Sequence, residues 1–118
     1  MKIAIIGVGL IGGSMALKLK EKGLVSEVFG IDQSEDHLHE AKELGIINHI
    51  STLEAVIPNV DLVIIAIPVD SARKLLPSIL DLMNDQQTVM DVGSTKAGIT
   101  KAIKNHPKRK RFVASHPM

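Results

Sequence analysis

Cysteine, tryptophan and tyrosine are absent from the 118-residue chain, and its only aromatic side chains are Phe29 and Phe112. Without cysteine the chain holds no disulfide bond, no thiolate nucleophile and no thiolate metal ligand. With two aromatic rings it lacks the stacking surfaces that bind single-stranded nucleic acids. The sequence also lacks an apolar run long enough to span a membrane. We therefore expect neither a nucleic-acid nor a membrane partner.

Neither sign of charge dominates the chain. It has 14 lysines and arginines against 13 aspartates and glutamates, so the formal net charge of +1 gives no hint of a polyanionic partner. The basic run at residues 108–111 has no interleaved aromatic residues, so it is expected to be a solvated loop. His37 and His39 are two residues apart and do not share a helix face, so they are not expected to form a metal pair. No metal site is predicted.

Glycine is concentrated in the first stretch of the sequence. Gly7, Gly9 and Gly12 form a G-x-G-x-x-G pattern between an apolar run at residues 2–6 and an amphipathic run that ends at Gly23. In a dinucleotide-binding unit these three glycines allow a tight turn, close approach of backbone to a pyrophosphate, and close packing of helix on strand. An ordinary glycine-rich turn is the alternative. The residues expected at the pyrophosphate are Gly7, Val8, Gly9, Leu10, Ile11 and Gly12.

Asp32 follows the next apolar segment, at residues 28–31, about 20 residues after Gly12. A carboxylate at this position accepts hydrogen bonds from the adenosine ribose and repels a 2′-phosphate. Residues 33–36 are Gln, Ser, Glu and Asp, so no arginine lies nearby in sequence to bind that phosphate. The pattern favours NAD over NADP. In the alternative interpretation, Asp32 only caps the following helix.

Apolar periodicity predicts alternating strands and helices along the rest of the chain. Six consecutive apolar residues at 62–67 indicate a strand buried on both faces, which is typical of a parallel sheet covered by helices. The expected fold is α/β: a Rossmann, doubly wound, mainly parallel sheet of order 3-2-1-4-5-6, formed by residues 1–118 as one domain. The predicted strands are 2–6, 28–31, 46–50, 62–67, 88–92 and 111–114, and the predicted helices are 10–22, 34–44, 52–56, 69–83 and 93–104.

In such a fold, ligands bind outside the carboxyl ends of the strands. Ala66, Ile67 and Pro68 end the central strand, and we expect them to form a wall beside the cofactor. Pro68 could also do no more than terminate that strand.

Two later strands place polar residues at the same edge. Ser94 begins a predicted helix, either as its cap or with its hydroxyl aimed into the cleft. His116 follows the last strand, where a neutral imidazole can take a proton from a substrate hydroxyl. Lys96 is a further candidate at the substrate, although a solvated lysine is the ordinary alternative.

Three segments together resemble the prephenate dehydrogenase family, which includes arogenate-using enzymes. They are GVGLIGGS at residues 7–14, DVGSTK at 91–96 and HPM at 116–118. The resemblance implies an NAD-dependent or NADP-dependent oxidoreductase that decarboxylates prephenate oxidatively to 4-hydroxyphenylpyruvate in tyrosine biosynthesis. It also implies that His116 takes the proton of the ring hydroxyl and that Ser94 helps to position the reacting groups.

Members of this family continue beyond the nucleotide-binding domain with a helical domain, which forms a homodimer and supplies cationic groups for the substrate. The present sequence stops at Met118. We therefore expect it to be the cofactor-binding part, with little or no turnover of prephenate or arogenate alone. Glycines interrupt the apolar N-terminal run, which argues against a signal peptide and for a cytoplasmic protein.

Two other functions fit the first half of the sequence. One is a regulatory module that senses a nucleotide without catalysis, which would not need Ser94 or His116. The other is a different small-molecule NAD(P)-dependent dehydrogenase, such as a hydroxyacid dehydrogenase. Those enzymes tend to carry their acid–base group on a later helix, so His116 favours the prephenate dehydrogenase interpretation.

Overall fold

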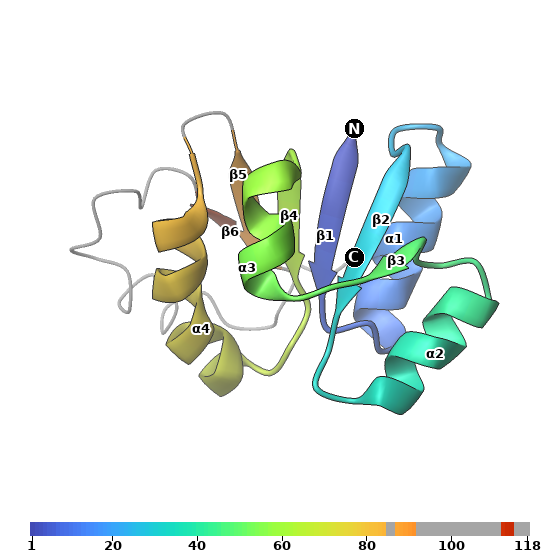
Figure 1. Cartoon of the computed structure of the whole chain (residues 1–118), viewed down its shortest axis with the longest axis horizontal. Helices are drawn as coiled ribbons and strands as arrows, with labels where there is room; N and C mark the ends of the chain where they lie inside the picture. Colours follow the sequence, from blue (N-terminus) through green and yellow to red (C-terminus); the bar gives the residue numbers. More distant parts are fainter. Residues whose placement is uncertain (85–86, 92–111, 115–118) are drawn as a thin grey trace.

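In a computed structural model of the chain, a single parallel sheet carries helices on both faces (Figure 1). The structure describes residues 1–84, 87–91 and 112–114. Strands and helices alternate as the sequence predicts as far as residue 91, and the helix predicted at 93–104 lies outside the described residues. In chain order the elements are β1 (Lys2–Ile6), α1 (Leu10–Glu21), β2 (Glu27–Ile31), α2 (Glu35–Glu43), β3 (His49–Ile50), α3 (Leu53–Val56), the 3-10 helix η1 (Ile57–Asn59), β4 (Leu62–Ile65), α4 (Val69–Leu82), β5 (Thr88–Asp91) and β6 (Phe112–Ala114).

The strand order is β3-β2-β1-β4-β5-β6, which confirms the predicted doubly wound topology. All neighbouring strands run parallel. Residue Ile5 of β1 is aligned with Gly30 of β2 on one side and with Ile64 of β4 on the other, so β1 lies at the centre. The prediction for the third strand was too long: β3 has only two residues, both exposed, because this edge strand has a single neighbour.

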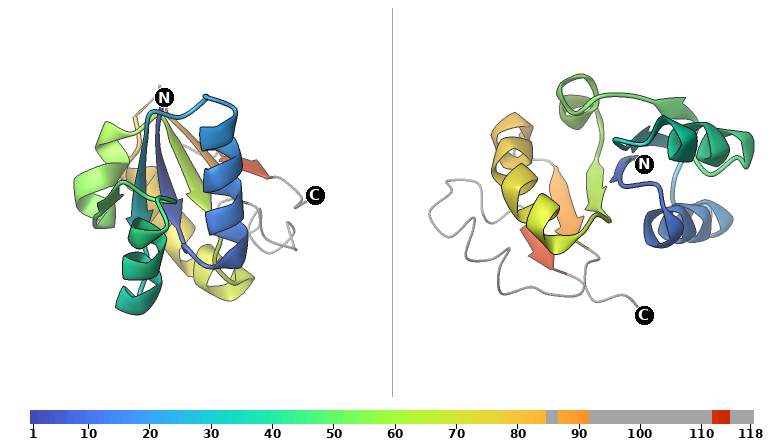
Figure 2. Two further views of the ribbon diagram at one scale, coloured as in Figure 1. Left: turned by 90° about the vertical axis from the view of Figure 1, so that its right-hand side faces the viewer. Right: turned by 90° about the horizontal axis from the view of Figure 1, so that it is seen from below.

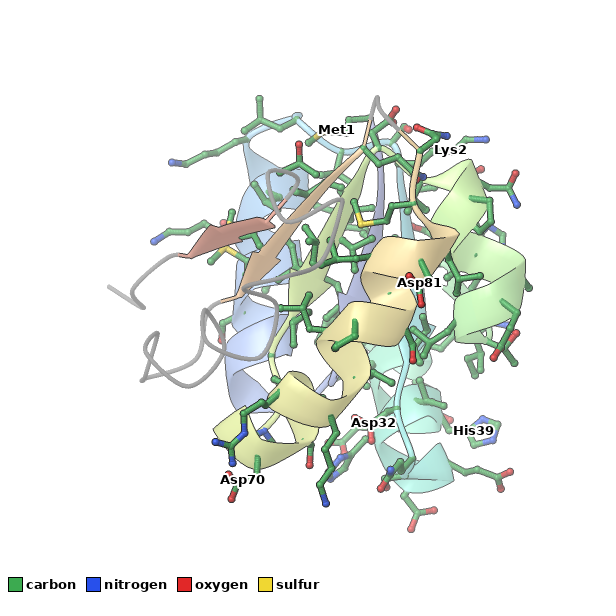
Figure 3. The ribbon with its side chains drawn as sticks, turned by 90° about the vertical axis from the view of Figure 1, so that its left-hand side faces the viewer. Met1, Lys2, Asp32, His39, Asp70 and Asp81 are labelled. Atoms are coloured by element: carbon green, nitrogen blue, oxygen red, sulfur yellow. The ribbon has the colours of Figure 1, made fainter. Side chains whose placement is uncertain are left out.

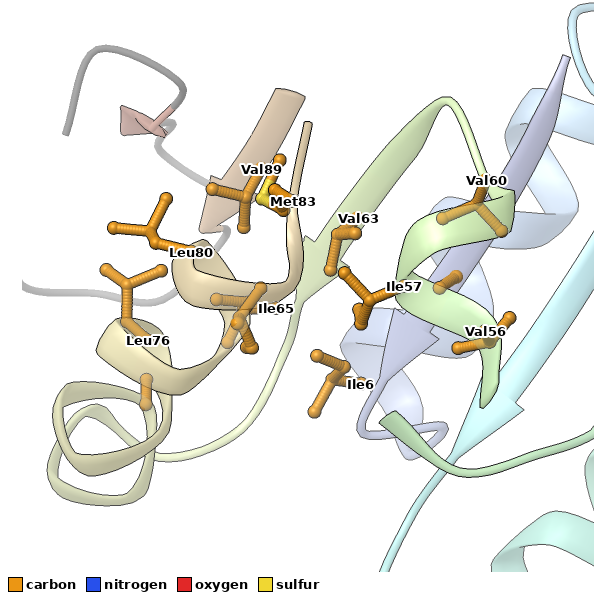
Figure 4. Packing of buried hydrophobic residues seen from close by; sticks show 13 residues of the cluster. Ile6, Val56, Ile57, Val60, Val63, Ile65, Leu76, Leu80, Met83 and Val89 are labelled. Atoms are coloured by element: carbon orange, nitrogen blue, oxygen red, sulfur yellow. The ribbon is translucent and has the colours of Figure 1, made fainter. Parts of the chain in front are cut away.

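The sheet separates two apolar cores, because successive side chains of a strand point to opposite faces. Alternate residues of β1 and β4 enter the first core, which α3, η1 and α4 cover (Figure 4). The intervening residues enter the second core, which α1 and α2 cover. Figure 2 shows α1 and α3 on opposite sides of the sheet. Ile3, Ile5, Ile64 and Ile65 are completely buried, as expected for strands covered on both faces.

Helices α1 and α2 end in the same way. Gly23 and Gly45 follow them with φ angles of 70° and 75°. The amide of the next residue bonds back into the last turn in both cases, from Leu24 to the Leu19 carbonyl and from Ile46 to the Ala41 carbonyl. These are Schellman motifs, and they return the chain to the start of the next strand at a fixed place.

The strands of one parallel sheet all end at the same edge, which is the lower edge in Figure 1. Met1 and Lys2 lie at the opposite edge, whereas Asp32 and Asp70 lie near the carboxyl edge (Figure 3). The turn after β1 and the turn after β2 therefore meet at the carboxyl edge. The Gly7 amide donates to the Ile31 carbonyl at 2.8 Å, which joins those two turns directly.

Gln87 is the one buried polar side chain among the described residues, with 3% of its surface exposed. Its Nε2 donates to the carbonyl oxygens of Ile57 and Val60, the latter at 2.6 Å, and its Oε1 accepts from the Asn84 amide at 2.8 Å. These bonds tie the segment between α4 and β5 to η1. Gln87 thus satisfies backbone groups that the apolar core would otherwise leave without a hydrogen-bond partner.

Replacing Gln87 should therefore destabilise the fold. We expect Gln87→Ala to lower the free energy of unfolding by about 2 to 4 kcal/mol, because it removes the donor from two buried carbonyl groups. Urea denaturation followed by circular dichroism measures this. Asn59→Ala is the matched control, since its side-chain amide is exposed and donates to the Ala55 carbonyl, so that its loss should cost less than about 1 kcal/mol. Equal losses in both variants would contradict the assignment.

Candidate functional site

A cavity of about 530 Å³ opens at the carboxyl edge of the sheet, where β1, β2 and β4 end. It brings together residues that the sequence analysis selected from three separate segments: Gly7 and Gly9, Asp32, and residues 66–68. Its size suits a small molecule or part of a dinucleotide. The residues around it are Ile6, Gly7, Gly9, Ile31, Asp32, Gln33, His37, Leu53, Ala66, Ile67, Pro68, Ser71 and Leu75.

The glycine turn has no room for side chains at two of its three motif positions. Gly7 has a φ of +94°, and a Cβ there would lie 2.6 Å from the Ala66 carbonyl oxygen. A Cβ on Gly12 would overlap the Gly7 carbonyl oxygen. Backbone of α1 thus packs directly on the end of β1. A Cβ on Gly9, in contrast, would meet nothing within 4 Å, and Gly9 lines the cavity.

The first turn of α1 is open to a ligand. Gly9 is the N-cap residue, no side chain caps the helix, and the first turn holds no acidic residue. Helix α2 differs, because the Ser34 hydroxyl caps it and Glu35 and Asp36 lie in its first turn. The amides at the start of a helix bind anions when nothing else satisfies them. The start of α1 is thus suited to a phosphate group, and Leu10 and Ile11 lie within that turn.

The Asp32 side chain joins the glycine turn to the start of α2. One carboxylate oxygen accepts from the Val8 amide of the glycine turn and the other accepts from the Ser34 amide at the start of α2, each at 2.9 Å. The side chain is only 14% exposed and lines the cavity. A carboxylate offers about four lone-pair positions, so two remain for the hydroxyl groups of a ligand. Asp32 therefore does not serve merely as a helix cap.

Most of the other residues around this cavity are apolar. Ala66, Ile67 and Pro68, which the sequence analysis selected, are among them. Leu53 and Leu75 also line the cavity, and sequence reasoning did not select them. An apolar slot beside a polar anchor is suited to a flat ring next to a sugar.

Sequence reasoning also missed Gln33, His37 and Ser71. His37 was considered only as half of a metal pair, yet its Nδ1 lies 3.7 Å from a carboxylate oxygen of Asp32. Each of the three residues lies within a few residues of the carboxyl end of a strand. That position is the signal that could have indicated them.

Ser94, Lys96 and His116 lie outside the described residues. The register of the sheet aligns Asp91, the last residue of β5, with Ala114, the last residue of β6. Both of these strand ends belong to the carboxyl edge. The roles of Ser94, Lys96 and His116 stay predictions.

Neither a metal centre nor a membrane-spanning helix is found among the described residues. No set of three histidine, aspartate or glutamate side chains in residues 1–84, 87–91 and 112–114 is arranged to hold a metal ion. No helix within that part of the chain has the length and apolar character needed to cross a membrane.

Residues 15–118 match the family described as "Prephenate dehydrogenase, nucleotide-binding domain". The chain belongs to this family. It is 33% identical over 120 residues to prephenate dehydrogenase of Lactococcus lactis and 34% identical over 119 residues to that of Bacillus subtilis. These alignments cover 99% and 98% of the chain but 34% and 32% of the relatives. The chain thus spans about a third of the length of these curated relatives.

A solved structure supports the same family assignment. The prephenate dehydrogenase of Aquifex aeolicus, in complex with hydroxyphenyl propionate and NAD⁺, superposes with a TM-score of 0.88 at 31% identity. The superposition covers 100% of this chain and 42% of that one. Its match to the whole α/β domain supports the nucleotide-binding fold seen here.

Three glycine substitutions separate the structural from the ligand-binding role of the turn. Gly12→Ala should lower the free energy of unfolding by about 3 kcal/mol or more, because its methyl group overlaps the Gly7 carbonyl. Gly9→Ala should change stability by less than about 1 kcal/mol yet weaken NAD⁺ binding at least about tenfold. Thermal denaturation and calorimetric titration measure the two effects.

Gly13→Ala is the control in this series. A Cβ on Gly13 would come no closer than 3.6 Å to a side chain, so stability and NAD⁺ binding should both be kept or slightly improved. Unimpaired NAD⁺ binding by Gly9→Ala would contradict the placement of a ligand against this part of the turn.

Proposed function

We propose that the chain is the NAD-binding part of an enzyme that decarboxylates prephenate oxidatively to 4-hydroxyphenylpyruvate. The observation that carries the proposal is Asp32, a carboxylate placed in the cavity beside an uncapped helix start and a glycine turn. The residues present fit NAD. Gly9 leaves space for a pyrophosphate to approach the backbone, and Asp32 has lone pairs that can accept from ribose hydroxyl groups. The NAD⁺ in the complex of the Aquifex aeolicus relative supports the same cofactor.

Each part of the site has a separate task in this proposal. The amides at the start of α1 bind the pyrophosphate, Asp32 accepts from the ribose, and Ala66, Ile67 and Pro68 exclude water from one side of the cofactor. When bound, NAD⁺ supplies the acceptor for hydride.

In this proposal His116 and Ser94 act directly on the substrate. His116 takes the proton of the substrate hydroxyl, and Ser94 fixes the imidazole or that hydroxyl by a hydrogen bond. Lys96 contributes a positive charge toward a substrate carboxylate. The family and the position of these residues beyond the ends of β5 and β6 support these roles.

The remaining partners follow from the same proposal. The substrate is prephenate or its amino analogue arogenate. The whole enzyme forms a homodimer through a helical domain, acts in the cytoplasm, and binds neither nucleic acid nor membrane. The prephenate dehydrogenases of Lactococcus lactis and Bacillus subtilis support the substrate class.

The cofactor assignment can be tested on the chain as it stands. Calorimetric titration should show NAD⁺ binding at least about tenfold more tightly than NADP⁺, because the Asp32 carboxylate repels a 2′-phosphate. Asp32→Asn should lose most of this preference, with stability recorded alongside because Asp32 also holds the glycine turn. Equal or tighter binding of NADP⁺ to the wild-type chain would overturn the assignment.

The role of His116 requires a polypeptide that extends this chain to the length of its relatives. We expect His116→Asn to reduce kcat with prephenate by at least about a hundredfold, since general-base catalysis contributes that much or more. NAD⁺ affinity should stay within about twofold, because the imidazole acts on the substrate. Unchanged turnover would exclude His116 as the base and would favour a nucleotide-sensing module or another dehydrogenase.

A further inference from the structure

A second cavity, of about 350 Å³, lies between α1 and α2, the two helices that cover the second core. Both helices lie toward the β2–β3 end of the sheet (Figure 1). The cavity exists because Gly13 of α1 and Ala41 of α2, which both line it, have little or no side chain. Most of the other residues around it are apolar as well, among them Val8 and Ile46. The surface between the two helices is thus an apolar hollow.

Two exposed leucines flank this hollow. Leu17 of α1 is 42% exposed, Leu44 at the end of α2 is 65% exposed, and both line the cavity. The other exposed large apolar side chains among the described residues lie elsewhere: Met1, Leu24 and Ile50. A single exposed leucine is ordinary, but two leucines beside one apolar hollow form a patch that becomes more stable when it is covered.

A hydrogen bond fixes how the two helices lie beside each other. Lys20 Nζ donates to the Gly45 carbonyl oxygen at 2.8 Å, so the last turn of α1 lies next to the end of α2. Both helices return from the carboxyl edge of one parallel sheet, so they run in the same direction. Leu17 lies one turn before Lys20 and Leu44 immediately precedes Gly45. The two leucines therefore lie at the same end of the hollow, and we call this surface the α1–α2 groove.

The two sides of the α1–α2 groove differ in charge. Residues 18–22, at the end of α1, include three lysines and one glutamate. Helix α2 carries four acidic residues and one lysine. The surface thus has a basic side and an acidic side with apolar side chains between them. Such a surface is complementary to itself, because a two-fold axis along the groove places the basic side of one copy on the acidic side of the other.

We propose that the α1–α2 groove is a contact surface between two copies of this chain. Helix α1 of each copy lies on α2 of the other, so Leu17 packs against Leu44 of the second copy. The symmetry brings four leucines together around the axis. Lys18 follows Leu17 and Glu43 precedes Leu44, so these two charges meet across the contact. This surface is separate from the helical domain assigned to the homodimer, and the inference does not depend on the proposed function.

The association should be weak. Two helices from each copy bury less area than a permanent dimer needs. We expect mostly monomer at about 20 µM and a large fraction of dimer at about 1 mM in sedimentation equilibrium. Raising the salt concentration from about 50 mM to about 500 mM should weaken the dimer without abolishing it, because salt screens the charges but does not weaken the leucine contacts.

Three leucine variants test the apolar part of the contact. Leu17→Ala and Leu44→Ala should each raise the dimer dissociation constant at least about tenfold, because each change removes two symmetric contacts. Leu24→Ala is the matched control. Leu24 is 53% exposed and lines neither cavity, so its loss should change the dissociation constant by less than about twofold. Circular dichroism should show all three variants folded, since each side chain is at the surface.

A charge exchange tests whether the occupant is a second copy. Lys18→Glu and Glu43→Lys each place like charges opposite one another, so each variant alone should dimerise less than the wild type does. An equimolar mixture of the two variants should associate again, because the mixed pair has opposite charges at both symmetric contacts. A contact with any other partner would not produce this recovery.

Each result decides a separate part of the inference. A wild-type chain that stays monomeric up to about 1 mM would exclude a second copy and would favour a different protein segment in the groove. Unchanged association of Leu44→Ala, or an equal loss in Leu24→Ala, would show that the contact lies elsewhere. If the mixture associates no better than its components, α1 does not lie on α2 of the other copy. Titration with NAD⁺ tests the proposed function independently of all these results.

Discussion

The contact between Gly12 and the Gly7 carbonyl oxygen is the constraint on which the site depends. A side chain on Gly12 would overlap that oxygen, so α1 reaches its position only because Gly12 lacks one. With α1 packed on the end of β1, the helix begins at Gly9, which lines the cavity, and no side chain caps it. The positive φ of Gly7 and the bond from Val8 to Asp32 fix the same turn from its other side.

Two cores hold this edge of the sheet in place. Side chains of β1 and β4 alternate between them, so helices anchor the central strands from both faces. Gln87 adds a polar anchor on one side, because it joins the segment before β5 to η1. A rigid sheet keeps the turns after β1, β2 and β4 at constant separation, as a site built from three segments requires.

The sequence was sufficient to predict the glycine turn and the succession of strands and helices, because both depend on local patterns: glycines at fixed spacing, and apolar runs. The strand order was predicted as the usual one for such a succession, and the structure has that order. It was not sufficient to predict Leu53, Ser71 or His37 at the cavity. These residues come from α3, α4 and α2, and only the crossovers between strands bring them to one place. The predicted length of β3 was wrong, since apolar content does not report how many residues of an edge strand pair with its single neighbour. The roles of Ser94 and His116 stay predictions.

The two hydrogen bonds of Asp32 have a consequence for how this domain can evolve. In the proposed function one residue recognises the sugar, and the same residue fastens the glycine turn through the Val8 amide and accepts from the Ser34 amide. A mutation that removed its charge to admit a different cofactor would also loosen that turn, so the first step of such a change would carry a cost in stability. Lineages that change cofactor should therefore keep this carboxylate and alter its exposed neighbours, where a substitution breaks no bond to the main chain.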